Sequence, residues 1–396
     1  MSAKEQNLVI VCRGMPPLVV GSTVLMRNLF QPYRGKLDAI AGWEHGAKVD
    51  PDYPPICPTH VLRFWPSILQ RAMEFRLVRF HCFIAKWFVY WKLKRLQPTA
   101  VFSACTPDGI FFVASFLACR RLGIPFWGHM HDLWLENTRQ GSFLEKLGKK
   151  WEPVIFREAD KIFCMTDTQR DYYKNKYGGN YEIIPHCVSS DVEIPIRPTV
   201  KTKSRDDEIQ ILYTGNINPL MNLDALKDMV ACLDFLPANY RIMMLTSTSA
   251  KTLQAEGICH PRLDLGWTSV VEARRLMREA DILFLPLSFK NCSAEEVRTV
   301  FATKTLDYLT SGVPILVYSP ATCHHSRSAK SHGWGCVVDD DNPQVLARAI
   351  QDLAGDRSRR ESLVKDAFEE AKRRNAIVWA RHIEDMVQQS HLARLP

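Results

Sequence analysis

The sequence predicts an α/β protein built from two Rossmann-like domains, each a parallel sheet covered by helices, that face a central cleft. Strand and helix signals alternate in two series, and a stretch rich in proline and charge separates them. Within the second series, two apolar runs, Asp281–Leu287 and Val313–Tyr318, flank a helical pattern that ends at Gly312. Continuous apolar runs around a helix are typical of a parallel sheet with both faces covered. A chain of 396 residues also exceeds one ordinary core, so two domains are expected.

The first series fills residues 1–190, which we expect to form the domain that binds an acceptor. Its expected strands are Leu8–Cys12, Leu37–Gly42, Ala100–Ala104, Pro125–His129, Lys161–Met165 and Tyr181–Pro185. Its expected helices are Ser22–Phe30, a long basic region over Pro66–Leu96, Gly109–Leu122, Phe143–Glu158 and Gln169–Tyr177. Repeated strand–helix units imply parallel strands joined by right-handed crossovers.

Residues 191–208 are expected to be the linker, because proline and charge interrupt the alternation there. The second domain is expected over residues 209–374. Its expected strands are Ile209–Tyr213, Arg241–Thr246, Arg262–Leu265, Ile282–Leu287, Val313–Tyr318 and Gly335–Val338. Two charged helices, Pro343–Leu353 and Arg357–Arg374, close it, and a last helix lies within residues 375–396.

Composition favours a soluble protein of the cytoplasm. Hydrophobic residues make up 46% of the chain and charged residues 24%, and no apolar run reaches the roughly 18 residues of a membrane span. The N-terminus enters a strand without the apolar core of a signal peptide. The 12 cysteines are scattered without a C-x-x-C pair, which is typical of reduced core thiols. Cys323-His324-His325 lacks a fourth ligand, so we expect a solvent loop there and no metal site.

Positive charge is concentrated in the first half. Residues 1–190 hold 25 Lys and Arg against 16 Asp and Glu, whereas the rest holds 26 against 27. Within Leu62–Leu96, eight basic residues accompany one acidic residue, Glu74, and nine aromatic side chains. A basic, aromatic helix suits an anionic membrane surface, although the same aromatic residues could instead pack on the domain's own sheet. No nucleic-acid-binding motif accompanies the charge, so we do not expect a nucleic-acid partner.

The strongest candidate site lies at the helix before Gly312. Lys304 and Asp307 are three residues apart, so a helix places both on one face. A lysine can pair with a phosphate, and a carboxylate can accept from both hydroxyls of a ribose. Phe301, Ala302 and Thr303 would open this helix and direct backbone N–H groups at phosphate. Neither half carries the G-x-G-x-x-G motif of nicotinamide dehydrogenases.

The pattern F-x-T-K-x-x-D-Y-L-x-S-G-x-P-I-L at residues 301–316 resembles the donor-nucleotide segment of family-four glycosyltransferases, which have the GT-B fold. Weaker similarities lie at Pro16–Ser22, at His131-Asp132, at Ile184–Val188, at Tyr213–Asn216 and at Gly333–Leu353. The resemblance implies a hexosyltransferase-type enzyme that moves a sugar from a nucleotide-diphosphate sugar to a glycan or lipid-linked acceptor. It further implies retention of anomeric configuration, no metal or other cofactor, and a role in cell-surface polysaccharide or glycolipid biosynthesis.

The same resemblance assigns roles to residues of both domains. His131 would contact the transferred sugar, with Asp132 orienting its ring, and Gly21 and Ser22 would bring a helix start near the phosphates. In the second domain, Gly215 and Asn216 form the turn after the first strand, Lys304 pairs with the diphosphate and Asp307 binds the ribose. The final helix is expected to cross back onto the first domain. An enzyme of this kind would work in the cytoplasm, peripherally at the inner face of the cell membrane.

The chain also departs from the family pattern. Asn216 and Met221 stand where many members carry Arg and Lys, so that cationic clamp is missing, and Thr299 replaces an acidic residue. Either Glu295 or Glu296 could substitute for it. Two alternatives therefore stay open, a nucleotide-sugar epimerase of the same fold and a non-catalytic binding or scaffold protein. The sugar, the base, the acceptor and the oligomeric state are not determined by the sequence.

Overall fold

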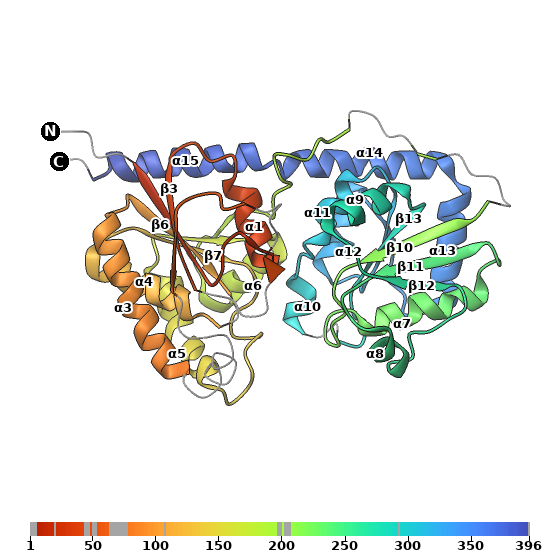
Figure 1. Ribbon diagram of the computed structural model, residues 1–396, viewed down its shortest axis with the longest axis horizontal. Helices are drawn as coiled ribbons and strands as arrows, with labels where there is room; N and C mark the ends of the chain where they lie inside the picture. Colours follow the sequence, from red (N-terminus) through yellow and green to blue (C-terminus); the bar gives the residue numbers. More distant parts are fainter. Residues whose placement is uncertain are drawn as a thin grey trace. The chain divides into compact units, whose positions relative to one another are not determined.

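The computed structural model describes residues 6–19, 21–42, 48–49, 54–62, 78–106, 108–195, 200–201, 207–291 and 294–394. The chain divides into two compact units (Figure 1). The first comprises Met1–Ser190 with Arg374–Pro396, and the second comprises Asp191–Arg373. The segment over residues 191–208, expected to be a linker, is thus grouped with the second unit, and the last helix with the first.

A seven-stranded sheet forms the centre of the first unit, with the strand order β5-β3-β1-β6-β7-β8-β9. Its strands are β1 (Asn7–Cys12), β3 (Lys36–Gly42), β5 (Thr59–Leu62), β6 (Ala100–Cys105), β7 (Phe126–Met130), β8 (Lys161–Cys164) and β9 (Glu182–Ile183). All of these neighbours pair in parallel, and Leu8 lies opposite Leu37 on one side and Ala100 on the other. A separate antiparallel pair joins β2 (Leu18–Val19) to β4 (Lys48–Val49).

Helices cover both faces of this sheet, as the alternation along β1 shows. Val9 and Val11 belong to a core with α3, α4, α5 and α6, whereas Leu8 and Ile10 belong to a core with α1 and α15. The helices are α1 (Gly21–Phe30), α3 (Val78–Leu96), α4 (Ile110–Leu122), α5 (Phe143–Glu158), α6 (Asp167–Tyr177) and α15 (Ala376–Leu392). The last helix, α15, packs against α1. Because the strands are apolar on both faces, this layering follows directly from the sequence.

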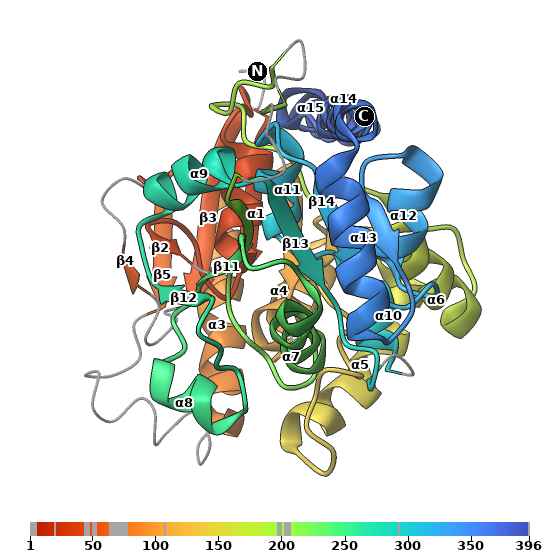
Figure 2. The same ribbon diagram turned by 90° about the vertical axis from the view of Figure 1, so that its right-hand side faces the viewer.

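The second unit contains a six-stranded parallel sheet with the order β12-β11-β10-β13-β14-β15 (Figure 2). Its strands are β10 (Ile209–Thr214), β11 (Tyr240–Leu245), β12 (Leu263–Gly266), β13 (Ile282–Pro286), β14 (Ile315–Tyr318) and β15 (Cys336–Val338). In both sheets the strand order therefore changes direction beside the first strand. Doubly wound α/β proteins bind ligands at such a topological switch point.

Helices again lie on both faces of the second sheet. They are α7 (Leu223–Ala231), the 3-10 helix η1 (Cys232–Phe235), α8 (Ala250–Ala255), α9 (Val270–Glu279), α10 (Glu295–Thr299), α11 (Lys304–Thr310), α12 (His324–His332), α13 (Pro343–Gly355) and α14 (Arg357–Arg373). Leu316 and Tyr318 share a core with α7, η1 and α13, whereas Val317 lies on the face where Ala329 of α12 packs.

Three expectations from the sequence change here. The segment before Gly312 contains two short helices, α10 and α11, rather than one. Cys323, His324 and His325 are buried at the start of α12, so the expected solvent loop is wrong. In the basic, aromatic region, α3 begins at Val78 within the described chain, and residues 63–77 lie outside the described residues. No helix in the described ranges combines the length and apolarity needed to cross a membrane.

Candidate functional site

The turn after β10 is held in a fixed shape at the carboxyl edge of the second sheet. Gly215 has a φ of 122°, a conformation that L side chains rarely adopt, and its N–H donates to the carbonyl of Leu245 at 2.9 Å. The Tyr213 hydroxyl donates to the Asn216 carbonyl at 2.7 Å and accepts from the Asn222 amide at 3.1 Å. Ser247 donates to the Asn216 side-chain oxygen at 3.0 Å. Because these bonds order the turn in advance, it can hold a ligand without rearranging.

Lys304 projects from α11 toward this turn. Its Nζ lies 3.8 Å from the centroid of the Tyr213 ring, a cation–π contact. A Cβ on Gly215 would lie 3.0 Å from the same Nζ, so glycine is needed for the ammonium to come this close. Burial lowers the pKa of Lys304 to about 7, since a charged ammonium loses solvation there. Within the described chain no carboxylate pairs with Lys304, which leaves the cation without an anion.

A cation nevertheless lies at this turn, and it comes from another element. Asn216 and Met221 carry no charge, yet the Lys304 ammonium reaches the backbone of Gly215 from α11. A desolvated cation that packs on an aromatic ring and has no carboxylate partner within the described chain is a good partner for a phosphate group, because an anion would restore the charge compensation that burial removes.

Asp307 lines a cavity of about 230 Å³ together with Gly215, Asn216 and Trp267. The cavity lies at the ends of β10, β11 and β12 and at the start of α9. The Asp307 Oδ1 accepts from Nε of Arg274 on α9 at 2.9 Å. This ion pair turns the carboxylate into a fixed acceptor, and its second oxygen remains available to a hydroxyl group. Arg274 and Trp267 were not found from the sequence, because no spacing or motif relates them to Asp307.

The segment that opens α11 is ordered by a histidine. The Ala302 N–H donates to Nε2 of His325 at 3.2 Å, and the Thr305 hydroxyl lies 3.2 Å from the same nitrogen. The Phe301 ring stacks on the His325 ring at 5.4 Å between centroids. The Ala302 N–H is consequently engaged within the protein rather than directed at a ligand, which differs from the expectation. Thr303, the cap residue of α11, makes no side-chain capping bond.

Glu295 and Glu296, the two candidates to replace the missing acidic residue, differ in their contacts. Thr299 is buried and its hydroxyl donates to the Glu295 carbonyl at 2.8 Å. The Glu295 carboxylate pairs with Arg298 at 2.6 Å, whereas Glu296 has no such ion pair within the described chain. Glu296 is therefore the carboxylate on α10 that is less engaged.

In the first unit, His131 follows β7 and is buried, with 4% of its surface exposed. Within the described chain neither ring nitrogen of His131 forms a hydrogen bond. Its pKa is lowered well below the usual value, chiefly by burial and next by the neighbouring His129, so the ring is neutral at pH 7. His129 is engaged through Nε2 with the Ile184 carbonyl at 3.0 Å, and burial lowers its pKa to about 4. Within the described chain, both ring nitrogens of His131 and only Nδ1 of His129 are without a hydrogen-bond partner.

Asp132 does not have the contact expected of it. Within the described chain its carboxylate forms no hydrogen bond with the His131 ring, so the expected orienting contact is not made in this conformation. Burial raises the pKa of Asp132. Gly21 and Ser22 open α1 as expected, with Gly21 exposed and Ser22 half-buried.

The loop that carries His131 is anchored by a buried ion-pair network. Lys176 on α6 contacts Glu136 at 2.7 Å and Glu152 at 2.8 Å, and Glu152 on α5 is fully buried. The other Glu152 oxygen accepts from the Leu135 N–H at 3.2 Å. The network thereby ties the loop after β7 to two helices. Neither its partners nor its role could be read from the sequence.

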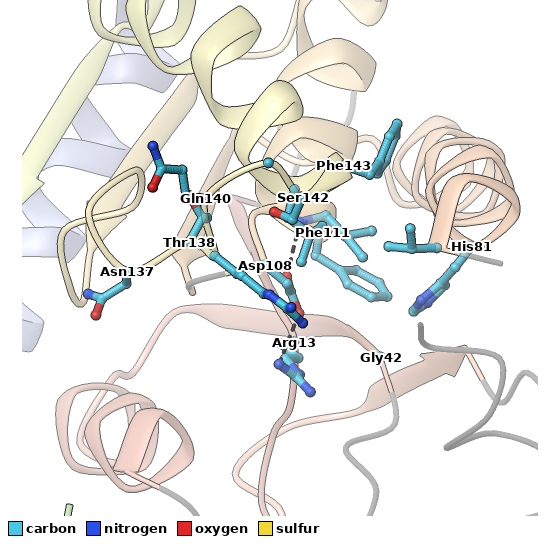
Figure 3. Close-up of a pocket in the computed structure, with 15 residues that line it drawn as sticks. Arg13, Gly42, His81, Asp108, Phe111, Asn137, Thr138, Gln140, Ser142 and Phe143 are labelled. Carbon is cyan, nitrogen blue, oxygen red and sulfur yellow. Dashed lines mark hydrogen bonds and ion pairs between the residues drawn. The ribbon is translucent and has the colours of Figure 1, made fainter. Parts of the chain in front are cut away.

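A larger cavity of about 590 Å³ also lies in the first unit (Figure 3). Arg13 and Asp108 form an ion pair of 3.1 Å at its centre. Figure 3 shows Asn137, Thr138 and Gln140 on one side, and His81, Phe111 and Phe143 on the other. Asp108 is held in place because its Oδ1 accepts from the Ile110 N–H at 3.0 Å. None of these residues was identified from the sequence.

Comparisons with known proteins agree with this architecture. Residues 50–192 match the model for Glycosyltransferase Family 4, which confirms the family-four resemblance over that segment. Among curated proteins, none matches the sequence.

Solved structures resemble the whole chain at low sequence identity. A sucrose-phosphate synthase from Thermosynechococcus elongatus has a TM-score of 0.66 at 13% identity, with 98% of this chain and 100% of that chain covered. HepE from Anabaena in complex with UDP has a TM-score of 0.64 at 13% identity, covering 97% and 100%. An E. coli trehalose-6-phosphate protein bound with UDP-2-fluoro glucose gives 0.64 at 12%, covering 97% and 99%. The fold is therefore GT-B, with two Rossmann-like units.

Proposed function

We propose that the protein is a glycosyltransferase that uses a nucleotide-diphosphate sugar as its donor. The observation that carries the proposal is the Lys304 ammonium, which is desolvated, has no carboxylate partner within the described chain and lies against the Gly215 turn. The cavity beside it offers an acceptor oxygen on Asp307. A phosphate-binding cation and a ribose-binding carboxylate on neighbouring turns of one helix are what a nucleoside diphosphate requires.

In this proposal each group has a separate task. Lys304 neutralises the diphosphate as it leaves, which is electrostatic stabilisation of the developing charge. Asp307, fixed by Arg274, accepts from the ribose hydroxyls. His131 is neutral and buried, so it can exchange hydrogen bonds with the sugar without adding charge. The acceptor oxygen forms the new bond to the anomeric carbon, the bond to the diphosphate breaks, and the acceptor proton passes to the departing phosphate.

Several finer statements rest on the family resemblance. They are retention of anomeric configuration, independence from metal ions, a hexose as the transferred group, and a glycan or lipid-linked acceptor in cell-surface polysaccharide or glycolipid biosynthesis. UDP-sugars are the first donors to try, since structures of similar fold were obtained with UDP and with a UDP-sugar. We place the protein in the cytoplasm.

We also propose that α3 holds the protein at the inner face of the cell membrane. Ala85, Val89 and Leu93 form the buried stripe of this helix, whereas Phe83 and Trp91 are 58% and 57% exposed. The helix contains no acidic residue. Exposed aromatic rings among lysines and arginines match the interface of an anionic membrane. The rest of the proposed membrane segment, residues 63–77, lies outside the described residues.

The proposal is tested by thermal-shift and calorimetric screening of UDP-, GDP-, ADP- and TDP-sugars, followed by an assay for donor hydrolysis and transfer. We expect one nucleotide class to bind, and Lys304→Met to weaken its binding strongly. Arg275→Met on the exposed side of α9 is the matched control, because it removes a cation from the same unit that pairs only with carboxylates of its own helix. Interconversion of donor sugars without an acceptor would indicate an epimerase. Absence of nucleotide binding would indicate a scaffold and contradict the proposal.

A further inference from the structure

The 590 Å³ cavity of the first unit has a polar side and an apolar side. Asn137, Thr138 and Gln140 lie on one side of the Arg13–Asp108 ion pair, and Phe111 and Phe143 lie on the other (Figure 3). The cavity thus has polar side chains on one side and aromatic side chains on the other, and this division fits a ligand with a polar head and an apolar tail.

The apolar side continues onto α3. Val78 and His81, in the first turn of α3, line the cavity, and Phe80 and Phe83 on the same turns are 48% and 58% exposed. A hydrocarbon chain that leaves the cavity past these residues would remain in contact with apolar surface. Beyond them the exposed aromatic residues of α3 extend as far as Trp91, which is 57% exposed.

Cations are placed where the polar and apolar sides meet. Arg13 is one-third exposed despite its ion pair with Asp108, and Arg139 is exposed at the rim. The Arg79 guanidinium lies 5.4 Å from the centre of the Phe143 ring. Among the residues that line the cavity, Arg13 and Arg139 are the arginines and Asp108 the carboxylate, and Arg79 lies against the lining residue Phe143. Guanidinium groups bind phosphate well, which favours a phosphate on the ligand.

From these observations we propose that this cavity binds a lipid phosphate as the acceptor substrate, with the phosphate at the arginines and the hydrocarbon chain along Phe111, Phe143 and α3. The proposal rests on the proposed glycosyltransferase function, which by itself left the choice between a glycan and a lipid-linked acceptor open. Transfer would then occur at the polar head of a molecule whose tail stays in the membrane to which α3 binds.

The test measures binding to the full chain by calorimetry, with farnesyl phosphate as the probe and farnesol and inorganic phosphate as comparison ligands. Farnesyl phosphate should bind at least tenfold more tightly than either comparison ligand, since only it engages both sides of the cavity. Arg139→Gln and Phe143→Ala should each weaken its binding severalfold, and the double variant should weaken it more than tenfold. Both residues are partly or fully exposed at the rim, so these variants should fold.

Two controls separate cavity binding from other effects. Phe235→Ser, on η1 of the second unit, removes an aromatic ring that is 48% exposed and does not line the cavity, and should leave farnesyl phosphate binding unchanged. Affinity for the nucleotide should also be unchanged in the Arg139 and Phe143 variants, because that site lies in the second unit. Equal binding of farnesyl phosphate and farnesol, or undiminished binding by the double variant, would overturn the lipid phosphate assignment. If farnesyl phosphate binds but no nucleotide does, the proposed glycosyltransferase function is contradicted and the lipid phosphate assignment is not.

Discussion

The ammonium of Lys304 lies 3.8 Å from the centre of the Tyr213 ring and has no carboxylate partner within the described chain. Tyr213 is the last residue but one of β10 and Lys304 begins α11, so two elements far apart in the sequence build this contact. Because the pKa of Lys304 is lowered to about 7, the free protein holds a cation that burial destabilises. An anion bound beside it would remove this penalty, which couples binding to protonation.

Nucleotide affinity should therefore depend on pH through Lys304. A bound diphosphate favours the charged ammonium and raises its pKa, so binding above about pH 7 takes up a proton. Between about pH 7.5 and 9, affinity should fall by up to roughly tenfold per pH unit in the wild type. Calorimetry in buffers of different ionisation enthalpy measures the proton uptake. A Lys304→Met variant should bind weakly with no such slope, and an identical slope in that variant would assign the effect to another group.

The same lysine should lower the stability of the ligand-free protein at acidic pH. The pKa of Lys304 in the folded protein lies below the value of 10.5 in a model peptide. The contribution of Lys304 to the stability of the fold is therefore complete above the unfolded pKa, and it is lost as the pH falls through about 7. Lys304→Met should accordingly raise the melting temperature more at pH 6 than at pH 9. An equal shift at both pH values would show that only packing had changed.

Replacing Asp307 should affect binding more than folding. Asp307→Asn keeps the shape of the side chain but removes the charged acceptor, and should cost about 1.5–3 kcal/mol of nucleotide binding. The Arg274 ion pair is partly exposed, with 31% and 29% of the two side chains accessible, so its loss should change stability only slightly. Calorimetry with the ribonucleotide and its 2′-deoxy analogue checks the ribose contact. If the variant discriminates between them as the wild type does, Asp307 does not bind the ribose.

The network around Lys176 should be needed for the loop that carries His131. Lys176→Met leaves the fully buried Glu152 carboxylate without its cation, and breaking a buried pair in this way costs roughly 3–5 kcal/mol. The double variant Lys176→Met with Glu152→Gln should recover much of that stability. Chemical denaturation measures both variants. A double variant that is no more stable than the single one would mean that the ion pair is not what anchors the loop.

Membrane binding should require the exposed aromatic residues of α3. The double variant Phe83→Ser with Trp91→Ser should lose co-sedimentation with anionic liposomes, while the wild type binds them at low salt and is released by added salt. Phe235→Ser is the control, since Phe235 is 48% exposed and belongs to the second unit. Equal binding by the wild type and the double variant would show that α3 is not the contact surface.

The sequence predicted most of the fold because local signals and packing agree. The helix α5 was expected and found at Phe143–Glu158, where Ser142 caps the first turn. Short elements were missed: β5 has four residues and α10 has five, too few for a periodic pattern. The helix that was expected to open at Phe301–Thr303 and end at Gly312 corresponds to α11, whereas α10 was not expected.

The candidate site was predicted less completely than the fold. Lys304 and Asp307 were identified because their spacing and surrounding motif are local. Arg274, His325 and the Arg13–Asp108 pair act through contacts that form only when distant elements pack. Arg274 and Asp307, for example, are 33 residues apart with no shared pattern. A hydrogen bond between Asp132 and the His131 ring does not form in this conformation, and nothing in the local sequence signalled its absence.

The central claim is that the second unit binds a nucleoside diphosphate through Lys304. Calorimetry with a nucleoside, its monophosphate and its diphosphate, on the wild type and on Lys304→Met, tests this most directly. The wild type should gain affinity with each phosphate, and the variant should lose the gain from the phosphates while its affinity for the nucleoside stays the same. Equal losses for the nucleoside and the diphosphate, or no binding of any of the three by the wild type, would contradict the claim.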